Sequence, residues 1–264
     1  MANARFRFIH SQSREGLTHF MKLSVLRTRF SKVATSLANP SCWRALSLGV
    51  APVIEHLPLL KTLDVDGVLD VGANRGQFSL ACIIALPSVP ILAFEPIPHE
   101  AELFCRIHQR SSVVLKRCAL GDKNSTSTLH VSKRADSSSL LPIGERQIAV
   151  YPETSEAGTI EVDVRVLDSF LPQVLGRNRQ LLKIDVQGFE LNVLRGGVEM
   201  LKLCQYVYAE CSEVTLYEGQ SLRPDVTAFL DEHGFSEKGS WNHCYSEGQL
   251  IQADYLYEKR LVRQ

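Results

Sequence analysis

The chain has 264 residues, of which 45% are hydrophobic, and its 29 Lys and Arg residues balance its 29 Asp and Glu residues. This composition excludes disordered, collagen-like and coiled-coil proteins, and the length suits one large or two small domains that each bury a core. The seven cysteines are widely spaced and form no C-x-x-C pair, so we interpret them as reduced cytosolic thiols that fill the core, without a disulfide framework or metal site.

The charge is unevenly divided along the chain. Residues 1–44 contain eight Lys or Arg and one Glu, a net charge of +7, whereas the remainder contains 21 basic and 28 acidic residues. No apolar run in residues 1–60 fits a signal peptide or a transmembrane segment. We expect a basic N-terminal extension over 1–44, which packs on the protein, contacts a second copy or is attracted to an anionic surface, with an organellar transit peptide as the alternative. Residues 45–264 form the predicted globular domain.

From about residue 67, short β-rich runs alternate with helical stretches, which is typical of a mainly parallel sheet covered by helices on both faces. The first half predicts strands over 67–72, 89–95 and 113–119 and helices over 77–86 and 98–110. An irregular section rich in Ser, Thr and Gly is interpreted as an insertion over 121–160, with strands at 127–131 and 159–166. The second half predicts strands over 180–186 and 206–210, helices over 190–203 and 225–233, and a hairpin of 236–242 and 250–257.

Glycine and acidic residues follow the predicted strands, at the edge where a doubly wound sheet binds its ligands. Gly72 and Gly76 allow a tight turn after the first strand, below the N-terminus of the next helix. Glu95 ends the second strand, 25 positions after Asp70, and a carboxylate there can accept hydrogen bonds from both hydroxyls of a ribose. Although Asp70 alone could cap a turn, the combination favours an adenosine-type cofactor.

The loop chemistry indicates which adenosine-type cofactor fits. Asn74 stands where a dinucleotide-binding loop has its second glycine, and the sequence contains no G-x-x-x-x-G-K-[ST] loop, so neither a pyrophosphate site nor a P-loop is expected. S-adenosylmethionine has no phosphate and carries two cationic centres. A glycine turn flanked by carboxylates therefore suits this cofactor.

Further carboxylates mark the later strand ends. Asp185 follows the strand over 180–186, and Glu210 ends the next strand. A carboxylate at the end of an apolar strand is costly unless the strand opens into a polar cleft, so both are candidate site residues. Glu190 lies in the first turn of the following helix, where the helix dipole alone would favour it.

The sequence resembles the FkbM-type family of S-adenosylmethionine-dependent methyltransferases over about residues 45–258. The likeness is carried by VLDVGANRGQFS at 68–79, AFEPIP at 93–98, CALGD at 118–122, DSSSLL at 136–141, LLKIDVQGFELNVLRG at 181–196, YAECS at 208–212, LYEGQ at 216–220 and QADYLY at 252–257. The resemblance implies a class I methyltransferase fold. This is a Rossmann-like α/β architecture with a mainly parallel seven-stranded sheet, an antiparallel C-terminal hairpin and helices on both faces.

The resemblance also implies roles for individual residues. The residues expected to contact the methionine part of the cofactor are Asp70, Gly72, Asn74, Gly76, Gln77 and Phe78. Glu95 is expected to bind the ribose, with Pro96 and Ala119 beside the adenine. Ser139 belongs to a loop that would close over the cofactor, although a plain Ser-rich turn is the alternative. Asp185 would lie nearest the transferred methyl group.

We expect a cytoplasmic enzyme that O-methylates a hydroxyl of a glycan or small metabolite without a metal. Deprotonating a hydroxyl calls for a carboxylate or His, and Asp185 is the expected base or orienting group, with Glu190, Glu210 and His99 as further candidates. Many family members carry Glu at the position of Gln187, so residue 187 is not the expected base. The acceptor pocket is expected from the 121–160 insertion and the loops after Asp185 and Glu210.

Two other classes of protein remain open at this point. An NAD-dependent oxidoreductase would share Glu95, and a binding module could retain the pocket without catalysis. A nucleic-acid substrate is not expected because the predicted globular domain is net acidic and lacks an aromatic and basic stacking motif.

Overall fold

The computed structural model describes residues 30–174 and 176–260. Within these residues, seven strands form the main sheet, in the order β3-β2-β1-β7-β8-β10-β9. Their bounds are β1 Gly67–Val71, β2 Ile91–Phe94, β3 Val113–Lys116, β7 Gln180–Ile184, β8 Cys204–Ser212, β9 Phe235–Ser246 and β10 Gln249–Lys259. All neighbours pair in parallel except β10, which is antiparallel to both β8 and β9. The predicted class I methyltransferase fold is therefore confirmed.

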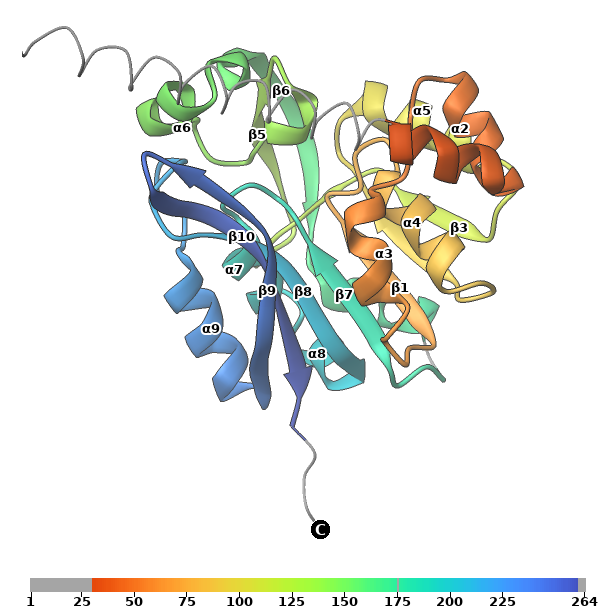
Figure 1. The fold of residues 1–264 in the computed structure, drawn as a ribbon. Helices are drawn as coiled ribbons and strands as arrows, with labels where there is room; N and C mark the ends of the chain where they lie inside the picture. The colour runs from red at the N-terminus through yellow and green to blue at the C-terminus, as the bar shows by residue number, and fades with distance from the viewer. Residues whose placement is uncertain (1–29, 175, 261–264) are drawn as a thin grey trace, which may run out of the picture.

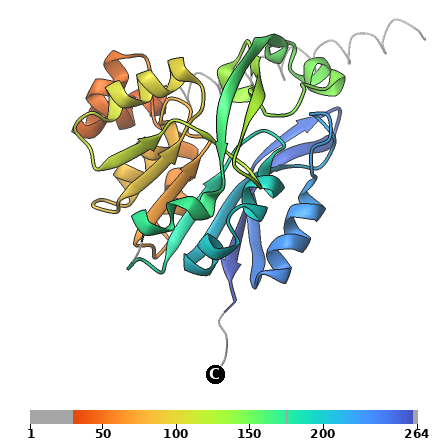
Figure 2. The same cartoon turned by 180° about the vertical axis from the view of Figure 1, so that it is seen from behind.

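Helices cover both faces of the main sheet (Figures 1 and 2). One face is covered by α3 Leu57–Leu60, α4 Gln77–Ala85 and α5 Pro98–His108, and the other by α7 Glu190–Arg195, α8 Val198–Leu203 and α9 Arg223–Glu232. Alternate strand residues supply the two cores: Val68 packs with α3 and α4, whereas Leu69 belongs to the core of α7, α8 and α9. This alternation follows from the period of two along a strand.

A second, three-stranded sheet lies beyond the carboxyl ends of β1 and β7 (Figure 1). It consists of β4 Ala119–Leu120, β5 Ser125–Ser132 and β6 Glu156–Arg165, in the order β4-β6-β5. The strands predicted at 127–131 and 159–166 are confirmed as β5 and β6, which pair antiparallel. The predicted single strand over 113–119 is wrong, because residues 113–116 pair with β2 and residues 119–120 pair with β6.

The predicted continuous helix over 190–203 is also wrong, because α7 ends at Arg195 and α8 begins at Val198. Gly196 and Gly197 separate the two helices. A Cβ atom at Gly196 would lie 2.0 Å from the carbonyl oxygen of Gly121, so the chain approaches the β4 end too closely for any other residue. Glycine is also a poor helix former, which favours the break.

Three further α-helical segments lie in the described residues: α2 Trp43–Ser47, α6 Glu145–Val150 within the insertion, and residues 30–38. The short 3-10 helices are Pro40–Cys42, Ile54–His56, Ala135–Ser137, Pro152–Thr154 and Leu167–Gln173. None of the helices in the described ranges is long and apolar enough to cross a membrane. Five of the seven cysteines are buried, which confirms their expected place in the core. Residues 1–29 of the predicted basic extension lie outside the described residues, and its end at residue 44 stays a prediction.

Candidate active site

A cleft opens at the carboxyl ends of β1, β2 and β7, and residues of the second sheet and of the segment 135–140 also line it. It contains about 620 Å³ of empty space, part of it open to solvent. Among its lining residues are seven of those predicted to bind the cofactor: Gly72, Asn74, Glu95, Pro96, Ala119, Ser139 and Asp185.

The other four predicted cofactor residues lie behind this lining. Asp70 is fully buried, and its Oδ2 accepts a hydrogen bond of 2.7 Å from the hydroxyl of Ser79. Gly76 has a φ of +83° and precedes α4, and Gln77 is the first residue of that helix. Phe78 packs into the core between α4 and the sheet. These residues therefore support the glycine loop rather than line the cleft.

Gly72 brings the loops after β1 and β7 together. Its φ of +76° is in the left-handed region, and a Cβ atom there would lie 1.8 Å from the backbone oxygen of Asp185. Only glycine satisfies both requirements without moving the loop after β7. The sequence predicted this glycine as a turn residue, and the structure adds the close approach to Asp185.

Glu95 is held by the backbone of two loops. Its Oε2 accepts a hydrogen bond of 2.8 Å from the Asn74 amide, and its Oε1 accepts one of 2.7 Å from the Ile97 amide. Burial raises the pKa of Glu95 to about 7, although both hydrogen bonds act to lower it. Because each carboxylate oxygen has two acceptor sites, the oxygens can still accept hydrogen bonds from two ligand hydroxyls.

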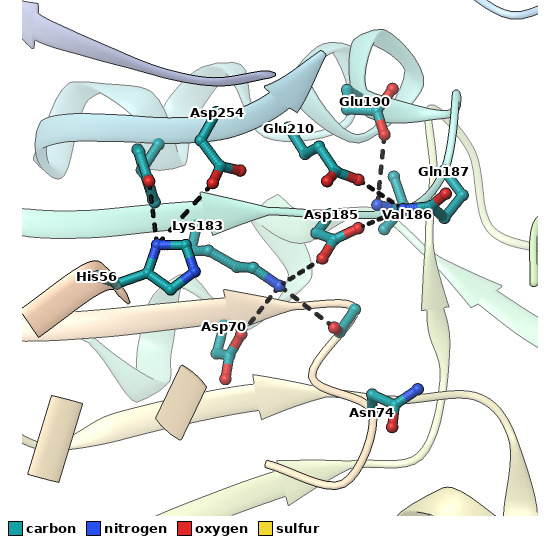
Figure 3. A network of polar contacts seen from close by, with 12 residues as sticks. His56, Asp70, Asn74, Lys183, Asp185, Val186, Gln187, Glu190, Glu210 and Asp254 are labelled. Atoms are coloured by element: carbon teal, nitrogen blue, oxygen red, sulfur yellow. Dashed lines mark hydrogen bonds and ion pairs between the residues drawn. The ribbon is translucent and has the colours of Figure 1, made fainter. Parts of the chain in front are cut away.

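Asp185 and Glu210 are joined by the side-chain amide of Gln187 (Figure 3). Gln187 Nε2 donates to Asp185 Oδ1 at 2.7 Å and to Glu210 Oε2 at 2.6 Å. The hydroxyl of the buried Tyr217 lies 3.0 Å from Gln187 Oε1, which fixes the orientation of the amide. Removal from solvent raises the pKa of Glu210 well above its usual range, and the neighbouring Asp185 raises it further.

Lys183 is a site residue that sequence reasoning missed. Its Nζ lies 3.4 Å from Asp185 Oδ2 and 3.6 Å from Asp70 Oδ1, and it donates to the carbonyl oxygen of Gly72 at 3.3 Å (Figure 3). Burial alone would lower the pKa of Lys183, but the surrounding carboxylates raise it overall. The ammonium group therefore balances the charges of two aspartates from neighbouring strands. The sequence feature that could have indicated Lys183 is the K-I-D stretch, where a charged side chain precedes Asp185 by two positions in a buried strand.

The remaining candidates for the base occupy different surroundings. Glu190 Oε1 accepts hydrogen bonds from the amides of Gly188 at 2.9 Å and Val186 at 3.3 Å. This buried carboxylate therefore holds the loop between β7 and α7. Burial raises the pKa of Glu190 to about 7. The side chain of His99 is 79% exposed and lies beside Glu100, outside the cleft lining.

A second cavity adjoins the cleft and contains about 650 Å³ of empty space, part of it open to solvent. It shares Asp136, Asp185 and Gln187 with the cleft. The other lining residues are Arg134, Ser137, Gln147, Tyr151, Thr154, Glu210, Cys244 and Gln252. The insertion, the loop after β7 and β8 itself, through Glu210, thus border this cavity, and the terminal hairpin adds a wall that the sequence did not predict.

A further polar cluster, also missed from the sequence, lies on the α3 side of Lys183 (Figure 3). His56 Nδ1 is 3.0 Å from the hydroxyl of Tyr208, and Asn242 Nδ2 donates to Asp254 Oδ2 at 2.6 Å. Burial lowers the pKa of His56, although the nearby Asp254 acts to raise it. Tyr208 and Asp254 stood within motifs of the resemblance, where no role was assigned to either.

Comparison with known proteins places these residues in a family context. The sequence pattern of the Methyltransferase FkbM domain matches residues 70–237. The 2-O-methyltransferase NoeI of Sinorhizobium fredii (strain NBRC 101917 / NGR234) is 30% identical over 161 residues, which are 58% of this chain and 66% of that protein. Methyltransferase 1 of Beauveria bassiana (strain ARSEF 2860) is 32% identical over 145 residues, which are 49% of this chain and 57% of that protein.

A third relative, 31-O-demethyl-FK506 methyltransferase FkbM of Streptomyces tacrolimicus, is 29% identical over 197 residues, which are 65% of this chain and 73% of that protein. The matched region spans less than two thirds of the length of the first two relatives. The family match includes Gly72, Glu95, Asp185 and Glu210, which border one or both of the cavities, whereas Cys244 and Gln252 of the second cavity lie outside it.

Proposed function

The chain belongs to the FkbM methyltransferase family, and we propose that it transfers the methyl group of S-adenosylmethionine to a hydroxyl group of an acceptor bound beside Asp185. The observation that carries this proposal is the position of Asp185, which lines both the cleft and the second cavity. A cofactor in the first and an acceptor in the second would meet at this carboxylate. The methyl group would cross from one cavity to the other there.

The charge of the cleft supports S-adenosylmethionine over a dinucleotide. Among the described residues that line the cleft, three are carboxylates, Glu95, Asp136 and Asp185, and none is Lys or Arg. A pyrophosphate would gain no cationic partner here, whereas a cationic and phosphate-free cofactor is favoured. The apolar side chains of Ala119 and Leu129 border a place for the adenine.

When bound, S-adenosylmethionine supplies a methyl group that its sulfonium activates for direct displacement. Glu95 would hold the ribose hydroxyls, and Gly72 would let the cofactor approach the backbone of the first loop. Ser139 donates a hydrogen bond of 2.8 Å to the carbonyl oxygen of Gln187, which ties the loop over the cleft to the loop after β7. These residues would align the cofactor, which is the main contribution of the protein to such a displacement.

Asp185 is arranged to receive the proton of the acceptor hydroxyl. Lys183 and Gln187 each hold one of its oxygens, and a side chain that is 33% exposed leaves room for a further hydrogen bond. The acceptor oxygen would form its bond to the methyl carbon as the carbon–sulfur bond breaks, the sulfur would leave as a neutral thioether, and the hydroxyl proton would pass to Asp185. Glu210 would position Asp185 through Gln187, and Glu190 would position it through the loop after β7.

The printed names of two relatives support a hydroxyl acceptor, since one is a 2-O-methyltransferase and another is a 31-O-demethyl-FK506 methyltransferase. Calorimetric titration of the full chain with S-adenosylmethionine, S-adenosylhomocysteine and NAD tests the cofactor. We expect micromolar or tighter binding of the first two and at least tenfold weaker binding of NAD. Tighter binding of NAD would favour an oxidoreductase, and cofactor binding without methyl transfer to any hydroxyl acceptor would favour a binding module.

A further inference from the structure

The second cavity contains a polar atom that has no partner in the described structure. Gln147 is the third residue of α6, it is one of the residues that line the cavity, and it is only 3% exposed. Its Oε1 is buried and accepts no hydrogen bond within the described residues. A buried amide oxygen without a partner is unfavourable, so a hydroxyl of a bound molecule would satisfy it.

We propose that the second cavity binds the acceptor as a neutral, polyhydroxylated molecule, and that Gln147 Oε1 accepts a hydrogen bond from one of its hydroxyls. This inference rests on the proposed function, because it takes Asp185 as the place where the methyl group is transferred. The acceptor would present one hydroxyl to Asp185 and a second one to Gln147. Gln147 is then a specificity-determining residue on an element that belongs to the insertion.

The helix that carries Gln147 is fixed to the rest of the domain. The amide of Gly144 donates to the carbonyl oxygen of Leu216 at 2.9 Å, and Arg146 Nη2 donates to Gln249 Oε1 at 2.7 Å. These bonds attach the N-cap and the second residue of α6 to the loop after β8 and to the terminal hairpin. The helix backbone at Gln147 is therefore held in place before a ligand arrives, which lowers the entropic cost of binding.

The charges around the cavity favour a neutral acceptor over an anionic one. Asp136 and Asp185 line it as carboxylates, together with Glu210, whose pKa is raised well above its usual range, against the single guanidinium of Arg134 among the described lining residues. Arg134 is already engaged, since it lies 2.9 Å from Asp136 Oδ2 and 3.1 Å from Glu153 Oε1. A carboxylate or phosphate on the acceptor would meet like charges without a free cation in this lining.

The remaining walls offer neutral hydrogen-bonding groups. Tyr151 follows α6 at the end of the same segment, and Gln252 lies on β10 across the cavity. A phenol and a carboxamide each both donate and accept, which matches the hydroxyl groups of a polyol. The tyrosine ring also provides an apolar surface for the carbon skeleton of such a molecule.

The test measures binding to the full chain by saturation-transfer NMR, with and without S-adenosylhomocysteine. The probes are neutral monosaccharides and myo-inositol, together with matched anionic compounds such as glucuronate beside glucose and glucose 6-phosphate. We expect at least one neutral polyol to bind, and its anionic counterparts to bind at least tenfold more weakly. Binding of no neutral polyol, or equal binding of the anionic compounds, would overturn the inference.

Variants locate the site on α6. Gln147→Met keeps the unbranched shape and removes the carbonyl oxygen, and we expect it to weaken polyol binding about tenfold. Glu145→Gln, an exposed position on the same helix, is the matched control and should leave binding unchanged. Should Gln147→Met fail to fold, Gln252→Met on the opposite wall replaces it with the same expected loss. Unaltered polyol affinity in the folded variant would place the acceptor elsewhere.

The cofactor titration separates this inference from the proposed function. Gln147→Met should bind S-adenosylhomocysteine as the wild type does, since Gln147 does not line the cleft. Loss of polyol binding with intact cofactor binding supports the acceptor site. If the wild type binds S-adenosylhomocysteine but no polyol, only the acceptor-site inference is contradicted. If the wild type does not bind S-adenosylhomocysteine, the proposed function is contradicted. The polyol titration then still shows whether the second cavity binds a polyol.

Discussion

The ionisation of Glu95 should control cofactor affinity near neutral pH. Burial raises the pKa of this carboxyl to about 7, and ribose hydroxyls donate best to its ionised form. Affinity should therefore be constant above pH 8 and fall as the pH drops through 7. At pH 6 about one tenth of the free protein carries ionised Glu95, so S-adenosylhomocysteine should bind about tenfold more weakly than at pH 8, a loss of about 1.4 kcal/mol.

The variant Glu95→Gln removes this dependence. Loss of two charge-assisted hydrogen bonds should weaken binding at pH 8 by about 10- to 100-fold, which corresponds to roughly 1.5–3 kcal/mol. The remaining pH dependence of the variant belongs to the ligand and to other groups, and it is subtracted from that of the wild type. Calorimetry at pH 6, 7 and 8 provides the measurement. A wild-type affinity that does not change over this range, or an equal slope in Glu95→Gln, would refute the reasoning.

The ionisation of Glu95 also affects the stability of the fold, and this effect has the opposite sign to its effect on cofactor affinity. A raised folded pKa means that the native state keeps the Glu95 proton while the unfolded chain loses it, so the contribution of this group to stability falls as the pH rises from about 4.5 to 7. At pH 8 the buried charge costs about 3 kcal/mol. The amide in Glu95→Gln avoids that cost but leaves one of two backbone amides unpaired, at about 1–3 kcal/mol. The net change should stay within about 2 kcal/mol.

Three further predictions concern other parts of the chain. Lys183→Met should lower the free energy of unfolding by about 3–5 kcal/mol, because the fully buried Asp70 loses its cationic partner. A loss below about 1 kcal/mol in a urea titration would contradict the role of Lys183 as the counter-charge of Asp70. Gly72→Ala should weaken cofactor binding at least tenfold, since its Cβ would overlap the backbone oxygen of Asp185, and unchanged affinity in calorimetry would show that the loop adapts. Deletion of residues 1–29 should leave cofactor affinity within about twofold, and a tenfold loss would show that the basic segment and the domain act as one unit.

Local sequence signals were sufficient for the strand ends. Gly72, Glu95 and Asp185 each follow a short apolar run, and parallel strands bring their carboxyl ends to one edge, so their meeting could be predicted from order and spacing. The break at Gly196 and Gly197 was not predicted, because glycine weakens a helix without excluding it, and the need for glycine comes from the approach of Gly121 to Gly196 and of Leu167 to Gly197.

Contacts between distant segments were beyond the sequence pattern. Lys183 reads as an ordinary strand residue until β1 brings Asp70 to its side. Gln187 differs from the acidic residue of many family members, yet its bridging role depends on Glu210, which is 23 positions away on the next strand. The wall that the terminal hairpin adds to the second cavity follows from the pairing of β8 with β10, which fixes Gln252 beside this site.

The central claim is that Asp185 receives the acceptor proton between two cavities, and Asp185→Asn tests it most directly. The amide keeps the shape and the acceptor oxygen for Gln187, so S-adenosylhomocysteine affinity should remain within about twofold. Methyl transfer to the polyol identified by binding, measured as release of S-adenosylhomocysteine, should fall by about 10²- to 10⁴-fold. Undiminished transfer by Asp185→Asn would contradict the account.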